Sequence, residues 1–171
     1  LDYYRLPKEG NHEQIKELQR KAFAEQIKLA LELDKALCVH CRPSDGTEDA
    51  YEEMLEIITR VKNENPLLRF EIHCYTGSAH LAKKFAELGG YIGLNGILTF
   101  DKSSRSREVV ETLSLENIIL ETDAPYLTPK SQRGKRNEPS FLPEVAEKIA
   151  EWKNVTIEEV AEQTTKNAKA L

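Results

Sequence analysis

Short apolar runs alternate along the chain with longer stretches in which apolar residues recur every three or four positions. Runs that are bounded by turn-forming residues and contain β-branched side chains are typical of buried strands. The first residues of the chain, at 1–3, have the same character on a smaller scale. We therefore predict a strand stub followed by four strands, at residues 36–40, 68–73, 91–94 and 117–121.

The longer stretches have the periodicity of amphipathic helices. Ser78 is the predicted N-cap of the helix after the second strand, and Gly89-Gly90 is predicted to end it. A capping box formed by Thr156 and Glu159 opens the last helix. The apolar faces that we expect to pack on the sheet are formed by Phe23, Ile27, Ala30 and Leu31, by Tyr51, Met54, Leu55, Ile58 and Val61, by Leu81, Phe85 and Leu88, and by Leu142, Val145, Ile149 and Trp152.

This alternation determines the predicted fold class. Strands separated by helices pair in parallel through right-handed crossovers. A closed eight-stranded barrel usually needs about 250 residues, and this chain has 171. We predict an α/β fold in which residues 1–171 form a single domain, half or more of a TIM-type (β/α) barrel with outer helices. An open α/β sheet is the alternative.

Charge and cysteine content narrow the functional classes. The net charge of −5 does not favour nucleic acid over the whole surface, so contact with a polyanion should be local. An odd number of cysteines, three, indicates reduced thiols and a cytoplasmic setting. No apolar run reaches the roughly 18 residues of a membrane span. Basic residues cluster in two segments that we expect to be loops, with Lys102, Arg105 and Arg107 in one and Lys130, Arg133, Lys135 and Arg136 in the other.

Three of the predicted strands end in side chains that bind metals well. His40 and His73 close the first two strands, and Asp123 follows the fourth. In barrels of this architecture the active site lies at the carboxyl ends of the strands. Neutral imidazole and carboxylate oxygen suit zinc, manganese or a similar divalent ion. A turn signal beside each of the three residues favours one shared metal site over three separate structural roles.

Five segments together indicate a family. Residues 1–5 (LDYYR), 39–42 (VHCR), 73–77 (HCYTG), 121–127 (ETDAPYL) and 133–139 (RGKRNEP) resemble, in order and spacing, the motifs of the TatD family of metal-dependent deoxyribonucleases. The resemblance implies a TIM-type barrel of the amidohydrolase-like superfamily with two divalent ions, Mg, Mn or Zn, at its C-terminal rim. It also implies hydrolysis of phosphodiester bonds, commonly by a 3′–5′ exonuclease on single-stranded DNA or RNA.

The resemblance assigns roles to individual positions. His40 and His73 would hold one metal, and Asp123 would hold the other and orient the attacking water. Neighbouring side chains have candidate supporting roles: Arg42, Tyr75 and Arg136 would bind the substrate, with Tyr126 as a further stacking candidate, and Glu121 and Glu138 would orient the ligands or their loop from behind.

Part of the family's ligand set lies outside this sequence. Family members have an HxH pair on the first strand and a bridging glutamate before a Gly-Leu-Asp that is reduced here to Leu1-Asp2. The chain also starts with Leu1 rather than Met. We therefore expect residues 1–171 to be the C-terminal portion of a (β/α)8 hydrolase barrel. We expect the isolated chain to be inactive because it lacks half of the ligands.

Two other functions remain open from the sequence. A hydrolase of the same superfamily could act on a small amide, lactone or ester, because polarising a carbonyl and activating water need similar ligands. A non-catalytic scaffold could have kept the barrel and lost the metals. We expect a monomer without membrane contact, with association through an unpaired strand edge as the alternative.

Overall fold

The four predicted strands form one parallel sheet. A computed structural model describes residues 1–7 and 9–171 of the chain. The strands lie in the sheet in the order in which they occur in the sequence. Each falls within its predicted run: β1 (Leu37–His40), β2 (Phe70–His73), β3 (Tyr91–Leu94) and β4 (Ile118–Leu120). The predicted α/β fold with parallel strands is confirmed.

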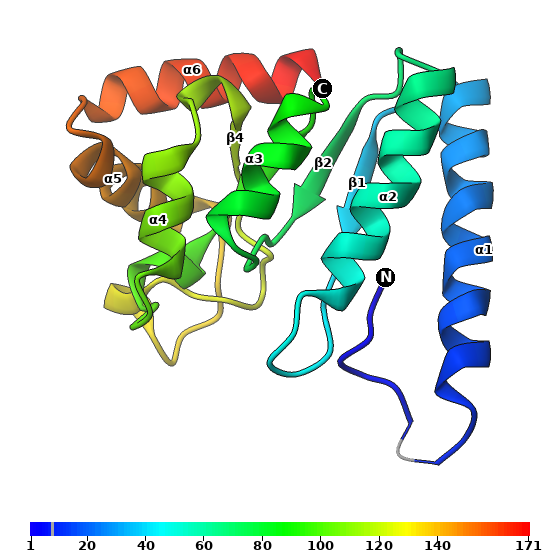
Figure 1. Cartoon of the computed structure of the whole chain (residues 1–171). Helices are drawn as coiled ribbons and strands as arrows, with labels where there is room; N and C mark the ends of the chain where they lie inside the picture. The colour runs from blue at the N-terminus through cyan, green and yellow to red at the C-terminus, as the bar shows by residue number, and fades with distance from the viewer. Residues whose placement is uncertain (8) are drawn as a thin grey trace.

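Helices connect and flank these strands. Figure 1 shows α1 and α2 side by side, and ion pairs of 3.0 Å join Lys16 to Asp49 and Arg20 to Glu53 between them. The predicted capping box at Thr156 is present at the start of α6, which packs against β4. The helices of the described residues are α1 (His12–Glu32), α2 (Asp49–Glu64), α3 (Ala79–Glu87), α4 (Arg105–Thr112), α5 (Leu142–Lys153) and α6 (Ile157–Ala170), with short 3₁₀ turns at Gly96–Thr99, Leu115–Asn117, Lys130–Gln132 and Pro139–Phe141.

The two faces of the sheet differ in chemistry because successive strand residues point to opposite sides. In β2, Phe70 and Ile72 are fully buried in the apolar core that the helices share. Glu71 and His73 alternate with them and stay partly exposed. β1 repeats the pattern, with His40 exposed at its end. The polar face therefore presents the titratable side chains, while the apolar face holds the helices.

The predicted strand stub pairs just beyond the end of β1. Asp2 and Arg42 form an isolated parallel bridge. The Arg42 N–H donates to the Leu1 carbonyl, and the Tyr3 N–H donates to the Arg42 carbonyl, both at 2.8 Å. These bonds fix the first residues of the chain against the segment that follows His40.

One segment that we predicted as a basic loop is partly a helix. Arg105 and Arg107 lie in the first turn of α4, not in a loop. The helix is short, and its two buried residues, Val109 and Val110, are adjacent in sequence. Its apolar positions therefore lack the spacing of three or four by which a helix is recognised from sequence.

Asp49 holds the loop between β1 and α2. Its carboxylate accepts hydrogen bonds from the Ser44 N–H (2.9 Å), the Ser44 hydroxyl (2.7 Å) and the Thr47 hydroxyl (2.9 Å), and pairs with Lys16. Partial burial alone would raise the pKa of this carboxyl. The bonds from Ser44, Lys16 and Thr47 outweigh the burial and hold the pKa well below its usual range.

Asp49→Asn is expected to lower the free energy of unfolding at pH 7 by about 1–3 kcal/mol, because hydrogen bonds to a charged acceptor are lost. A carboxyl whose pKa is depressed by folding stabilises the fold above its unfolded pKa. That stabilisation disappears as the pH falls toward the folded pKa. Urea denaturation should therefore show a smaller difference between the two proteins at pH 3 than at pH 7. Asp45→Asn, in the same loop and exposed, is the control; a difference that does not depend on pH would contradict the prediction.

Candidate metal centre

The first two candidate ligands lie at the same edge of the sheet. In the parallel register of β1 and β2, His40 is the partner of His73. Both therefore project from the same polar face at the carboxyl ends of neighbouring strands. His40 Nε2 lies 3.1 Å from the Asp2 carboxylate, so the N-terminal segment also contributes an acidic side chain here.

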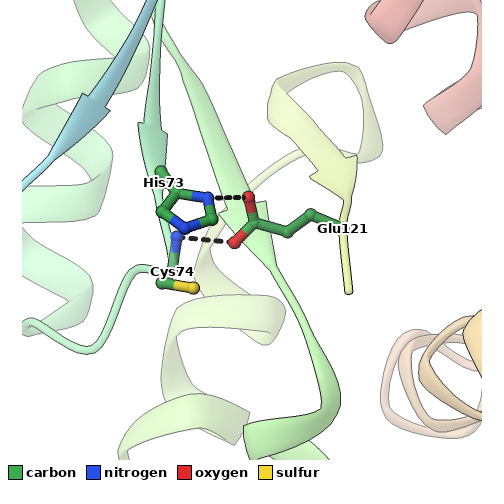
Figure 2. Close-up of side chains that lie close together, drawn as sticks. All are labelled: His73, Cys74 and Glu121. Atoms are coloured by element: carbon green, nitrogen blue, oxygen red, sulfur yellow. Dashed lines mark hydrogen bonds and ion pairs between the residues drawn. The ribbon is translucent and has the colours of Figure 1, made fainter. Parts of the chain in front are cut away.

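His73 lies between two carboxylates. Its Nδ1 is 2.5 Å from Glu121 Oε2, and its Nε2 is 3.2 Å from Asp123 Oδ1. Figure 2 shows the side chain of Glu121, which follows β4, pointing toward the imidazole ring of His73. The hydrogen bond to Glu121, reinforced by Asp123 and opposed by partial burial, raises the pKa of His73 to about 9.

Glu121 is held by several donors at once. Its other oxygen accepts the Cys74 N–H at 2.5 Å, and the Asn95 side-chain amide lies 3.4 Å away. The side chain is only 13% exposed. A Cβ on Gly93 would lie 2.8 Å from the carboxylate, so glycine at this position provides the space that Glu121 occupies. The carboxylate that faces His73 Nδ1 is therefore fixed in place by its surroundings.

The turns that carry two of these groups have an uncommon backbone. Cys74 has a φ of 51° and Asp123 a φ of 54°, in the left-handed region that side chains other than glycine seldom adopt. Each residue comes directly or closely after a strand, where the chain turns away from the sheet. Such conformations cluster at functional sites, where the surrounding structure maintains them.

The donor set fits a divalent cation. A neutral histidine whose Nδ1–H donates to a carboxylate has its Nε2 lone pair free for a metal, and a bound metal takes the place of the second imidazole proton. Here Glu121 takes Nδ1, and Asp123 lies beside Nε2. His73, Cys74 and Glu121 also offer ligand atoms within 4.8 Å of one another. The Glu121 carboxylate accepts bonds from His73, Cys74 and Asn95, an arrangement suited to orienting His73.

The other predicted site residues lie outside the cluster formed by His73, Glu121 and Asp123. Arg42 lies at the rim, with its guanidinium carbon 3.7 Å from the centre of the Tyr4 ring. Arg136 is exposed. Glu138 is exposed and accepts the Ser140 hydroxyl at 2.5 Å, so the structure gives it no contact with the candidate ligands. Tyr126 is 70% exposed.

The prediction that Tyr75 stacks on a substrate base is not supported. Its side chain is buried, its hydroxyl donates to the Ser78 carbonyl at 2.7 Å, and its ring packs 4.9 Å from that of Tyr51. The conformation of the turn after a strand decides whether the next side chain points to the rim or into the core. The left-handed conformation of Cys74 precedes Tyr75, and the Tyr75 ring lies in the core.

Buried Asn137 closes the loop after β4. Its side-chain amide donates to the carbonyls of Thr122 and Tyr126, each at 2.6 Å, and its N–H donates to the Pro125 carbonyl. These bonds bracket Asp123. Within the RNEP segment, Asn137 therefore makes the contacts that hold the loop around Asp123.

Three contributors were not assigned from the sequence: Asp2, Asn95 and Gly93. Asn95 had a usable signal, since it is a polar residue just beyond the end of a predicted strand, and Asp2 is the polar residue within the predicted strand stub. Gly93 could not have been found, because its role depends on the carboxylate of Glu121, which follows the neighbouring strand β4.

Comparisons with known proteins identify the family of the chain. The family model described as TatD related DNase matches residues 1–171. An uncharacterised metal-dependent hydrolase of Bacillus subtilis, YabD, is 40% identical over 157 residues, which cover 91% of this chain and 58% of that protein. A protein of Pantoea ananatis named 3′-5′ ssDNA/RNA exonuclease TatD is 32% identical, with coverage of 90% and 58%.

The fold is shared as well. The crystal structure of YjjV, a TatD homologue from Escherichia coli K12, superposes with a TM-score of 0.79 at 28% identity, covering 95% of this chain and 59% of that one. The chain thus spans somewhat more than half the length of the relatives it matches. Among the described residues, no helix combines the length and the apolarity needed to cross a membrane. Matched along its whole length, the chain belongs to the TatD-related DNase family of metal-dependent hydrolases and has its TIM-type α/β fold.

Proposed function

We propose that the protein hydrolyses phosphodiester bonds of single-stranded DNA or RNA, from the 3′ end, with two divalent ions such as Mg, Mn or Zn. The observation that carries this proposal is the position of His73 between Glu121 and Asp123, with His40 beside it in register. The printed name of the Pantoea ananatis relative supports the choice of substrate.

Each candidate residue has a definite task in this proposal. His40 and His73 hold one ion, and Asp123 holds the other and orients the attacking water. When bound, such ions supply an activated water and offset the charge that builds on the phosphate. Glu121 fixes the tautomer and the orientation of His73, and Arg42 lies at the rim where a phosphate of the substrate would pass.

Residues 1–171 account for only part of the length of the relatives. Since the relatives are longer, we propose that residues 1–171 are the C-terminal portion of the barrel. The HxH pair and the bridging glutamate would then lie in sequence that precedes Leu1. We also propose a monomer that works in the cytoplasm, in keeping with the three free cysteines.

Full-length protein is expected to shorten a labelled single-stranded oligonucleotide in the presence of Mn²⁺ or Mg²⁺, and to stop when EDTA is added. The isolated 171-residue chain should show no turnover under the same conditions, because it lacks half of the proposed ligands. Gel analysis of the products measures the direction of cleavage. Hydrolysis of amide or lactone substrates, with oligonucleotides left intact, would overturn the proposal in favour of the other hydrolase chemistry.

A further inference from the structure

A groove opens beside the candidate metal centre. Its volume is about 470 Å³, and its lining includes Tyr4, Arg42, Thr76 and Arg105. Arg42 and Thr76 follow the candidate ligands His40 and His73 by two and three residues. The groove therefore starts where the ligand-bearing strands end, and its volume lies within the range of small-molecule sites.

The aromatic and cationic residues of the groove are held together. The Arg42 guanidinium stacks on the Tyr4 ring at 3.7 Å, and half of Tyr4 is exposed. Backbone hydrogen bonds join Arg42 to Leu1 and Tyr3, the residue before Tyr4. They hold together the two backbone segments that carry the Arg42 and Tyr4 side chains. A guanidinium that stacks by its face keeps its N–H edges free, and these edges match the oxygens of a phosphate.

The arginines of the groove are not neutralised within it. Neither Arg42 nor Arg105 has an ion-pair partner in residues 1–7 and 9–171, although Asp45, Glu48 and Glu52 line the same groove. Glu48 is engaged elsewhere, since it accepts the Ser78 N–H at 2.6 Å. Separate cationic and acidic groups in one open groove suit a ligand that carries an anion at one end and hydrogen-bond donors at the other.

We propose that this groove binds one nucleotide of the substrate strand, with a phosphate at Arg42 and Arg105 and the base near Asp45 and Glu52. Tyr4 is the positioning residue that presents the Arg42 guanidinium. Carboxylates accept hydrogen bonds from the exocyclic amino group of cytosine, which thymine lacks. The site should therefore favour cytidine over thymidine. This inference rests on the proposed nuclease function and adds a subsite to it.

Binding of fluorescent (dC)6 to full-length protein, measured by anisotropy in EDTA, tests the subsite without hydrolysis. Arg42→Ala and Arg105→Ala should each weaken binding about 10-fold and lower the salt slope by about one. Tyr4→Ala should weaken it and Tyr4→Phe should not. Arg107→Ala is the matched control: it removes the same charge from α4, where Arg107 pairs with Glu111 at 2.7 Å. It should change binding less than 2-fold, in keeping with a lost surface charge.

The base preference has its own test. Wild-type protein should bind (dC)6 more tightly than (dT)6, and the double variant Asp45→Asn/Glu52→Gln should bind the two alike. Equal affinities of the wild type for (dC)6 and (dT)6 would contradict recognition of the base by Asp45 and Glu52. Circular dichroism spectra of all variants should match that of the wild type, since every substituted side chain lines the surface groove or lies on exposed helix.

Hydrolysis of bis(p-nitrophenyl) phosphate with Mn²⁺ separates this inference from the proposed function, since a small diester needs no groove. If the diester is cleaved but Arg42→Ala and Arg105→Ala bind (dC)6 like the Arg107→Ala control, the groove proposal is wrong and the nuclease function survives. If no diester is cleaved but the arginine variants lose binding, the groove binds nucleic acid and the proposed hydrolysis is wrong.

Discussion

Asp123→Asn is expected to lower kcat/KM of the full-length protein on a single-stranded oligonucleotide by about 1,000-fold, because the substituted group both holds one ion and orients the attacking water in the proposed mechanism. The amide keeps the size of the side chain but removes its charge. A neutral amide is a weaker ligand for a divalent ion and a weaker partner for His73, which lies 3.2 Å away. Calorimetric titration with Mn²⁺ should show a parallel loss of metal affinity.

Asp34→Asn is the matched control for this substitution. Asp34 also has a left-handed backbone, with a φ of 48°, and its exposed carboxylate pairs with Arg69 at 2.9 Å. It lies in the segment before β1, at the opposite end of that strand from His40. Turnover and Mn²⁺ affinity should stay at the wild-type level in this variant. Wild-type turnover by Asp123→Asn would remove Asp123 from the proposed site.

Gly93→Ala is expected to weaken Mn²⁺ binding by about 10- to 100-fold, the usual effect of disturbing the groups behind metal ligands. The added Cβ would lie 2.8 Å from the Glu121 carboxylate, and the carboxylate would have to leave His73 and the Cys74 N–H. The buried donors left behind would also lower the free energy of unfolding, by about 1–3 kcal/mol. Calorimetry and urea denaturation measure the two effects.

A double-mutant cycle decides whether Gly93 acts through Glu121. Once Glu121→Ala has removed the carboxylate, adding Gly93→Ala should cost little more, because the clash no longer exists. Additive losses in the double variant would show that Gly93 matters for a reason other than the space for Glu121.

The apolar pattern of the chain is sufficient to predict much of the fold. The strands are short runs that must be buried on the helix side, and their carboxyl ends coincide with His40 and His73. Since parallel strands with right-handed crossovers place those ends at one edge, the approximate position of the candidate metal site follows from order alone. Local hydrogen bonding predicts the helix starts in the same way, as Ser78 and Thr156 confirm.

The features of the site that the sequence did not predict depend on contacts between residues far apart in the chain. Glu121 meets His73 across 48 positions, and Gly93 matters only because that contact exists. The burial of Tyr75 and the stacking of Arg42 on Tyr4 likewise depend on the packing of separate segments. A sequence pattern reports the local preferences of the backbone and the side that each residue faces. Which donors surround a carboxylate is decided by register and packing, which arise only when the whole sheet is assembled.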